Sequence, residues 1–202
     1  MGDPATDDAE LARRARAGCV ASYAALAARH QVAVVHYVAG MLGRGGGRRG
    51  DAEDVAQQAL LQGYRRVSEY RSDGPFAAWL FAIARRTCLN HVRADRRRAA
   101  RLANLRPDAV DPTPGPAELA AAADGRRRLW EIARRTLPER QFTALWLQYV
   151  ESLSVADIAL VLGRSRAAVK VLLLRGRRRL EPLLAEFDPE RFTAAGRGVR
   201  DG

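Results

Sequence analysis

Cysteine and lysine are both scarce in this 202-residue chain. Cys19 and Cys88 are its only cysteines, which excludes a disulfide framework and a zinc knuckle. We expect a protein of the reducing cytoplasm in which both thiols are small buried packing residues, with a redox-sensing role as the alternative. Lys170 is the single lysine, so arginine carries almost all of the positive charge.

Long hydrophobic runs are missing as well. No stretch of about 18 consecutive apolar residues occurs, so we expect no transmembrane helix and no membrane insertion. The first ten residues, MGDPATDDAE, are acidic and polar, unlike the basic start and apolar centre of a signal peptide. Both absences favour a cytoplasmic location.

The usual signatures of catalysis and metal binding are absent too. The histidines, His30, His36 and His91, show no i, i+4 pairing, and no Ser-His-Asp order or paired catalytic acids stand out. The segment GRGGGRRG at 43–50 lacks a preceding strand signal and a following Lys-Ser/Thr pair, so it predicts an interhelical loop and not a phosphate cradle. We expect no enzymatic activity, no cofactor and no metal; a nucleic-acid-processing enzyme is the weakest interpretation.

Positive charge is abundant. Lys plus Arg number 34 against 23 Asp plus Glu, a formal net charge of +11. The planar guanidinium of arginine pairs well with phosphates and guanine edges, so the excess predicts a polyanionic partner, most simply nucleic acid. A generic basic surface from GC-rich codon usage is the alternative, and composition alone does not separate the two.

The chain divides into two blocks with helical periodicity and no sustained strand pattern. Residues 8–98 form the first block, and residues 126–187 form the second. Between them, residues 99–125 include four prolines and a glycine within ten positions, which predicts a flexible linker. Residues 188–202 have the composition of a tail. The expected fold is therefore all-α, with two small helical domains joined by a Pro-rich linker.

The segment DAEDVAQQALLQGYRRV at 51–67 predicts an amphipathic helix with acidic residues in its first turn. A helical wheel places the core face on Ala56, Leu60, Gly63, Tyr64 and Val67. Another side carries Asp54, Gln58, Leu61 and Arg65. Leu61 is therefore either a common surface leucine or part of a stripe that binds a partner.

The helix expected after Pro75 combines aromatic residues with arginines. Phe76, Leu80, Ile83 and Thr87 form its core stripe, and Trp79 lies at the edge of that stripe. Arginines occupy much of the remaining surface. Aromatic rings that stack on bases, together with arginines that pair with phosphates, are typical of proteins that bind single-stranded nucleic acid.

Residues 138–180 predict a helix-turn-helix. Pro138 opens a helix, and Ser154, with Asp157 three residues later, caps the next one. Gly163 ends that short helix, and Ser165 caps the last helix. This DNA-binding motif usually consists of two helices joined by a short turn that contains glycine, and its second helix is cationic.

The last helix carries more apolar residues than a DNA-facing helix needs. The wheel directs Val169, Leu172, Leu173, Gly176 and Leu180 inward. Its outward side combines basic and apolar residues: Ala167, Lys170, Val171, Leu174, Arg175 and Arg178. Val171 and Leu174 either touch thymine methyl groups in the major groove or are covered by a protein partner.

With both blocks in view, residues 10–184 resemble a bacterial extracytoplasmic-function (ECF) sigma factor of the sigma-70 family. Four segments carry the resemblance in order: LARRARAGCVASYAALAARH, DAEDVAQQALLQGYRR, FAAWLFAIARRTCLNHVR, and the segment from LPERQF to RGRRRL. The resemblance implies sigma domain two at 1–98, a linker at 99–125 in place of domain three, and sigma domain four at 126–187. It also implies core RNA polymerase and promoter DNA as partners, with an anti-sigma factor as a possible third.

The resemblance assigns three sets of residues. The set that binds the polymerase β′ clamp helices comprises Asp54, Gln57, Gln58, Leu61 and Arg65, while domain four contacts the β flap. The set that reads and opens the −10 element comprises Arg71, Ser72, Asp73, Trp79, Arg85, Arg86, Asn90, Arg93, Arg96 and Arg97. The set that enters the major groove at the −35 element comprises Ser165, Arg166, Ala167, Lys170, Val171, Leu174, Arg175 and Arg178.

The sequence departs from the family pattern at DNA-reading positions. Arg86 stands where the family often has Asn, Ala168 where Thr is usual, and Val171 and Leu172 where Ser and Arg are common. The alternative function is a stand-alone helix-turn-helix transcriptional regulator, which residues 138–180 alone do not exclude. The first block discriminates, because a simple repressor has no need of DAEDVAQQALLQGYRR followed by WLFAIARR.

Overall fold

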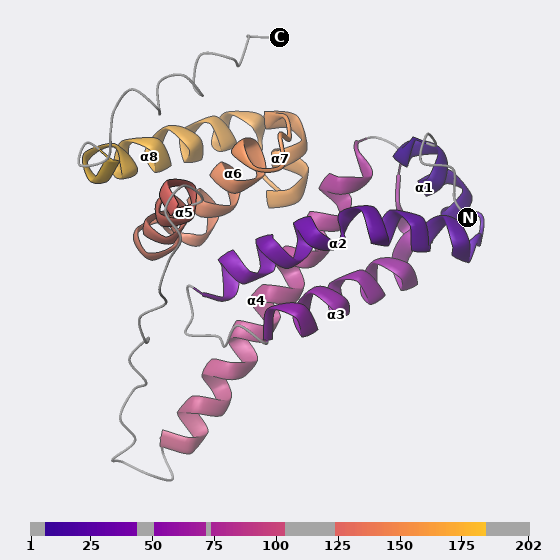
Figure 1. Cartoon of the computed structure of the whole chain (residues 1–202), viewed down its shortest axis with the longest axis horizontal. Coiled ribbons are helices and arrows are strands. Elements are labelled where there is room, and N and C mark those ends of the chain that lie inside the picture. Colours follow the sequence, from indigo (N-terminus) through magenta and orange to yellow (C-terminus); the bar gives the residue numbers. More distant parts are fainter. Residues whose placement is uncertain (1–6, 44–50, 72–73, 104–123, 185–202) are drawn as a thin grey trace.

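The computed structural model describes residues 7–43, 51–71, 74–103 and 124–184, and within these ranges the chain is helical with no strand. The elements in order are α1 (Asp8–Arg16), α2 (Val20–Leu42), α3 (Asp51–Arg66), the 3-10 helix η1 (Val67–Glu69), α4 (Phe76–Ala103), α5 (Asp124–Thr136), α6 (Glu139–Tyr149), α7 (Val155–Leu162) and α8 (Arg166–Leu184). Figure 1 shows α1 to α4 on one side and α5 to α8 on the other. The expected all-α fold is confirmed.

The first block is built around α2, α3 and α4, which pack on one another while α1 lies across the start of α2. Gly18, at φ 98°, makes the turn between α1 and α2, a backbone conformation that L residues rarely adopt. The expected core stripe of α4 is confirmed, because Phe76, Leu80, Ile83 and Thr87 are all buried. The far end of α4 extends beyond the other helices (Figure 1).

The expected core face of α3 is confirmed at Ala56, Gly63 and Val67, and Leu60 packs partly buried against the core, but Tyr64 departs from it. Tyr64 is 42% exposed, and small residues are buried in its place, including Ala52, Val55 and Ala59. The physical reason is the close approach of the neighbouring helices: a methyl group added at Gly63 would collide with the hydroxyl of Tyr23. Large side chains are therefore excluded from the centre of this face, and Tyr64 turns outward beside Tyr23.

The second block contains the expected helix-turn-helix in α7 and α8. The Ser154 hydroxyl accepts a hydrogen bond from the Asp157 N–H, while the Asp157 carboxylate accepts one from the Ser154 N–H, each at 3.2 Å. Gly163 ends α7 at φ 60°, and the Ser165 hydroxyl accepts from the Ala168 N–H at 3.2 Å. At Gly176, an added Cβ would lie 2.8 Å from Leu145 Cδ1, so glycine permits the close packing of α8 on α6.

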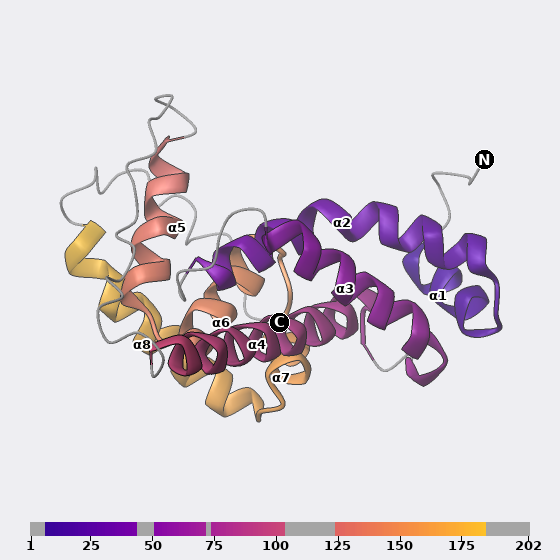
Figure 2. The ribbon, with the colours of Figure 1, turned by 90° about the horizontal axis from the view of Figure 1, so that it is seen from below.

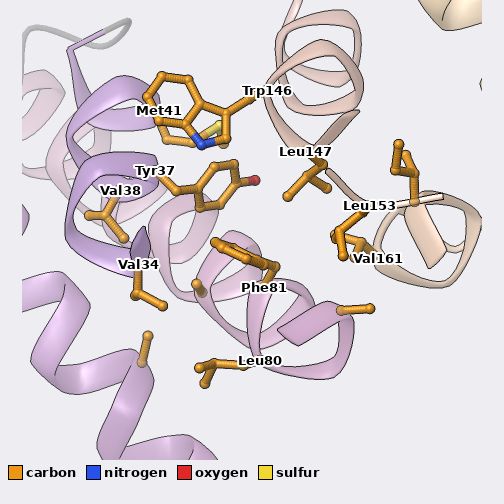
Figure 3. Packing of buried hydrophobic residues seen from close by; sticks show 14 of the residues in the cluster. Val34, Tyr37, Val38, Met41, Leu80, Phe81, Trp146, Leu147, Leu153 and Val161 are labelled. Carbon is orange, nitrogen blue, oxygen red and sulfur yellow. The ribbon is translucent and has the colours of Figure 1, made fainter. Parts of the chain in front are cut away.

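One hydrophobic core joins the two blocks. Figure 3 shows Tyr37 and Met41 of α2 and Phe81 of α4 facing Trp146 and Leu147 of α6. The packing of α4 on α7 and of α2 on α6 agrees with this, and the view from below shows the second block against α4 (Figure 2). The two blocks are therefore packed together, although the sequence predicted a flexible linker between them.

The expected domain boundaries remain a prediction. Helix α4 continues past residue 98 to Ala103, while most of the expected linker, the tail at 188–202 and nearly all of the glycine-rich loop lie outside the described residues. Within the described ranges, no helix combines the length and apolar character needed to cross a membrane.

Candidate nucleic-acid interface

The turn before α4 and the first residues of that helix form an aromatic pocket. The Tyr70 hydroxyl donates to the Gly74 carbonyl oxygen at 2.7 Å and so ties the end of η1 to the residue before Pro75. The rings of Tyr70, Phe76 and Trp79 pack together with centroids 5.4 to 5.6 Å apart. Trp79 is half-buried and lines an open pocket that also includes Arg71 and Leu160. An aromatic wall with an adjacent guanidinium is suited to an unstacked base and its phosphate.

Further along α4, a polar and cationic face is open to solvent. Arg86, Asn90, Arg93 and Arg97 recur at three- and four-residue spacings, so they share one side of the helix, and all are exposed, as is neighbouring Arg96. The expected −10 set therefore extends from the pocket along α4. Two of its members, Ser72 and Asp73, lie outside the described residues.

Arg85 differs from the other arginines of this set because it has a carboxylate partner in the second block. Its Nε and terminal nitrogen donate to the two carboxylate oxygens of Glu139 at 2.7 and 2.9 Å, and the side chains are only 16% and 25% exposed. Burial alone would lower the pKa of Arg85, but the bonds and charge of Glu139 outweigh it and raise the pKa. Arg85 is thus held in a bidentate ion pair.

The second predicted DNA surface lies on α8 and is open. All eight residues of the −35 set are exposed: Ser165, Arg166, Ala167, Lys170, Val171, Leu174, Arg175 and Arg178. Val169, Leu173 and Leu180 are buried as expected, while Leu172 is half-buried. Val171 and Leu174 remain 44% and 47% exposed, so the fold leaves two apolar side chains in the middle of a cationic face.

A third surface lies on α3. Asp54, Gln57, Gln58, Leu61 and Arg65 are all exposed, and Leu61 is 50% exposed despite being apolar. They occupy the side of α3 opposite its small buried residues. The surface combines acidic, amide, apolar and basic groups, which suits a specific protein contact.

Sequence reasoning missed Glu139 and Leu160. Nothing local marks Glu139 as the partner of Arg85, since 54 positions separate them. A signal did exist for Leu160: the helix VADIALVL is apolar on nearly every side, which indicates burial on more than one face. Leu160, on one of those faces, lines the pocket beside Trp79 and is 53% exposed.

The cysteines and acidic residues add no site. Cys88 is buried as expected, and burial raises its pKa to about 12. The prediction that Cys19 is buried was wrong: this thiol is exposed at the turn before α2, where a hydrogen bond from the Ser22 hydroxyl lowers its pKa. Among the described residues, no group of three or more His, Cys, Asp or Glu side chains is placed to hold a metal ion.

Curated relatives extend over most of the chain. An ECF RNA polymerase sigma factor, BldN of Streptomyces coelicolor, is 30% identical over 88% of this chain and 66% of its own length. A probable RNA polymerase sigma factor, RfaY of Xanthomonas campestris, is 35% identical over 68% of this chain. The chain spans 66% and 35% of these two relatives. The RNA polymerase sigma-H factor of Pseudomonas aeruginosa is 31% identical over 89% of this chain and 96% of its own length.

Solved structures show a similar fold. CnrH, in complex with the cytosolic domain of CnrY, matches with a TM-score of 0.65 and 24% identity over 90% of this chain and 99% of that chain. The sigma factor RpoE of Bartonella quintana, in complex with the anti-sigma factor NepR, matches with a TM-score of 0.52 and 21% identity over 79% of this chain and 97% of that chain.

Family models match both blocks. Residues 26–98 match sigma-70 region 2, and this match ends within α4. Residues 133–180 match sigma-70 region 4, and this match includes the helix-turn-helix. The region 4 match begins in α5 and ends in α8. Together with the sigma-H relative, which is matched over nearly its whole length, these findings show that the chain belongs to the ECF subfamily of the sigma-70 family of RNA polymerase sigma factors.

Proposed function

We propose that this chain binds core RNA polymerase through the α3 surface and directs it to promoters, which it opens at the −10 element and contacts at the −35 element. One observation carries the proposal: three exposed surfaces of different chemistry, on α3, α4 and α8, lie on one compact body. A stand-alone regulator needs only the α8 surface. The proposed place of action of this chain is the cytoplasm, where polymerase and DNA meet.

The α3 surface is the proposed contact with the β′ clamp helices. Leu61 supplies an exposed apolar anchor, and Asp54, Gln57, Gln58 and Arg65 surround it with polar groups. A central apolar contact within a polar rim is the usual arrangement of a protein interface. The second block would contact the β flap.

At the −10 element, the proposed role of α4 is to bind the separated strand. Arg86, Arg93 and Arg97 would neutralise phosphates, and Trp79 would stack on an unpaired base. Phosphates are present in both duplex and single strand, but Trp79 can stack only on a base that has left the duplex, so this contact shifts the equilibrium toward open DNA. The process breaks no covalent bond, so we expect no catalytic activity of its own.

At the −35 element, α8 would lie in the major groove. Lys170, Arg175 and Arg178 would pair with phosphates or base edges, and Val171 and Leu174 would contact thymine methyl groups. An anti-sigma factor is the proposed alternative occupant of the same face, because the two apolar residues would be buried by an amphipathic partner. RpoE, which has a similar fold, was solved in complex with an anti-sigma factor.

Run-off transcription tests the proposal. Core RNA polymerase alone and polymerase with the purified chain are incubated with genomic fragments, and start sites are mapped. We expect defined transcripts only in the presence of the chain. If the chain neither co-purifies with core polymerase nor changes the transcripts, but still binds duplex DNA, the stand-alone regulator is the correct interpretation.

Leu61→Glu tests the docking surface. Leu61 lies off the core, so the variant is expected to keep its helix content and lose most of its binding to core polymerase, by about tenfold or more for a central apolar contact. Val32→Glu is the matched control, because Val32 is an exposed apolar residue of α2 outside the proposed surface. Equal retention of both variants on immobilised core polymerase would exclude the α3 surface.

A further inference from the structure

The rotation of α8 about its own axis is fixed by its inner face. Val169, Leu173 and Leu180 are buried where α8 packs on the other helices of the second block. Between them, Gly176 lets α8 approach α6 so closely that an added Cβ would lie 2.8 Å from Leu145 Cδ1. Because this face is held, helical periodicity decides which residues stand directly opposite, on the side that meets a ligand.

The side of α8 opposite its buried face is apolar along the centre. Ala167, Val171 and Leu174 follow one another at spacings of four and three residues, so they form one apolar stripe. Val171 and Leu174 are 44% and 47% exposed. None of the three side chains carries a hydrogen-bond donor or acceptor, so the apolar stripe recognises its ligand through apolar contact alone.

Cations border the apolar stripe on both edges. Lys170 lies on one side of it and Arg175 on the other, while Arg178 continues its line by one further turn. The one acidic residue of α8, Glu181, lies beyond Arg178 towards the end of the helix. Positive charge on both edges complements the phosphate backbones on the two sides of a major groove, which leaves the apolar stripe facing the base edges between them.

The size of the apolar stripe also favours a duplex over a protein partner. From Ala167 to Leu174 it extends over about 10 Å of helix, at about 1.5 Å per residue. This length matches about three base pairs, at about 3.4 Å for each. Three short aliphatic side chains supply little of the roughly 800 Å² that each partner buries in a stable protein interface.

The chemistry of the base edges then selects thymine. In the major groove thymine presents a 5-methyl group, whereas cytosine presents an N–H donor and guanine presents two acceptors. An aliphatic side chain placed against a donor or acceptor displaces its water and offers no hydrogen bond in return, which is unfavourable. A methyl group packs against the same side chain at no such cost. Val171 and Leu174 are three residues apart, with Cβ atoms separated by about 5–6 Å, so they reach methyl groups on neighbouring base pairs.

We propose that Val171 and Leu174 determine promoter specificity by recognising the 5-methyl groups of pyrimidines in two neighbouring base pairs of the −35 element. The inference rests on the proposed function for the placement of α8 in the major groove, and it names what α8 reads there. Thymine always carries this methyl group, and cytosine carries it only when it is methylated at C5. The chain therefore binds a site with neighbouring thymines, rejects the same site with cytosines, and partly accepts 5-methylcytosines.

Selection from short duplexes of random sequence supplies the probe. The full chain, immobilised alone and also in complex with core RNA polymerase, retains duplexes that are then sequenced. The same selection is made with the double variant Val171→Ala with Leu174→Ala, which changes two exposed residues and should stay folded by circular dichroism. We expect the unmodified chain to enrich two neighbouring thymines that the double variant does not enrich.

The enriched duplex, labelled with fluorescein, tests the methyl contact by itself, because deoxyuridine lacks only the 5-methyl group of thymidine. Deoxyuridine at both enriched positions should weaken binding about fifteenfold, from about fourfold for each methyl group withdrawn from apolar contact. Deoxyuridine at other thymidines of the duplex should have little effect. With cytosine at the two positions, methylation at C5 should strengthen binding. The double variant should lose both preferences, while Val20→Ala with Val32→Ala, at exposed positions of α2, should keep them.

The outcomes separate this inference from the proposed function. Equal affinity of the unmodified chain for the thymidine and deoxyuridine duplexes would refute methyl recognition and leave the apolar stripe to a protein partner. A preference for thymidine that persists in the double variant, or the absence of any enriched sequence, would refute it as well. Run-off transcripts that depend on the chain but form equally on both templates would support the proposed function without the inference. A chain that prefers the methylated duplex but neither binds core polymerase nor directs transcription would do the reverse.

Discussion

The two predicted DNA surfaces differ in how much of each the fold leaves free. On α8, all eight residues of the −35 set face solvent. On α4, the distal arginines are exposed, but Arg85 is paired with Glu139 and the pocket of Trp79 is bordered by Leu160 from the second block. An arginine-rich helix is therefore not uniformly available for phosphate, because a partner from elsewhere in the chain decides which guanidinium groups remain free.

The comparison also concerns stability. The face of α4 opposite the cationic residues packs against both blocks, whereas α8 packs only within the second block and its outer face carries little apolar area beyond Val171 and Leu174. Disruption of the α4 core is thus expected to affect the whole molecule, and changes on the outside of α8 are expected to affect binding alone.

The largest expected effect follows from Phe81→Ala, which removes a large side chain from the core that the two blocks share. Phe81 is 1% exposed and packs edge-on against Tyr37, so the cavity should lower the free energy of unfolding by about 3–5 kcal/mol. Urea unfolding followed by circular dichroism and by tryptophan fluorescence should show one shared transition. Tyr64→Ala, at an exposed ring, is the control with a small effect; two separate transitions in the unmodified protein would contradict a common core.

A smaller effect is expected on the outer face of α8. Lys170→Ala with Arg175→Ala should reduce the slope of log affinity against log salt for a promoter duplex by about 0.9 for each phosphate that the variant no longer neutralises, with no loss of stability. Arg16→Ala with Arg140→Ala removes the same charge from exposed sites elsewhere and should leave the slope nearly unchanged. Equal slopes in the two double variants would place the groove-binding surface away from α8.

Ser154→Ala tests the cap at the start of α7, the helix that carries Leu160. The variant lacks the side-chain hydrogen bonds to Asp157. Its free energy of unfolding should therefore be about 1 kcal/mol lower than that of the unmodified chain. The start of α7 should also exchange its amide hydrogens faster, as mass spectrometry can measure. Exposed Ser68 in η1 provides the control substitution, and an equal loss of stability there would argue against a specific cap.

The smallest effect is expected from Glu151→Gln, in the turn between α6 and α7. Burial raises the pKa of Glu151, although it accepts a hydrogen bond from Trp146 Nε1 at 3.1 Å. A carboxyl whose pKa is raised by folding destabilises the folded state when it is ionised, so the penalty is present above the folded pKa and disappears below the unfolded value. The variant should be slightly more stable at pH 7 and equal to the original below about pH 4, as thermal unfolding across pH would show. A constant difference at every pH would assign the effect to packing.

Local features of the second block were predictable from sequence. The cap formed by Ser154 and Asp157, the left-handed Gly163 and the cap at Ser165 depend on residues within three or four positions of one another. The exposed positions of α8 follow from helical periodicity and the burial of Val169, Leu173 and Leu180. Such features require no knowledge of distant packing.

Other expectations failed where packing between helices decided the outcome. The wheel placed Tyr64 on the core face by its position in the helical repeat, yet Tyr64 is exposed, because α3 approaches its neighbours too closely at Gly63 for a large side chain. Cys19 was expected to be buried, yet it lies in an exposed turn. A wheel treats each helix alone and gives no information on how closely a second helix approaches.

The sequence by itself determined the helical class, the helix-turn-helix with its caps, and the exposed sets of α3 and α8, because these depend on short-range bonds and on the repeat of one helix. Only the tertiary structure decided that the two blocks share a core, that Arg85 is paired with Glu139, and that Leu160 borders the pocket of Trp79. These contacts join residues more than 50 positions apart, and such pairs are selected by the packing of whole helices.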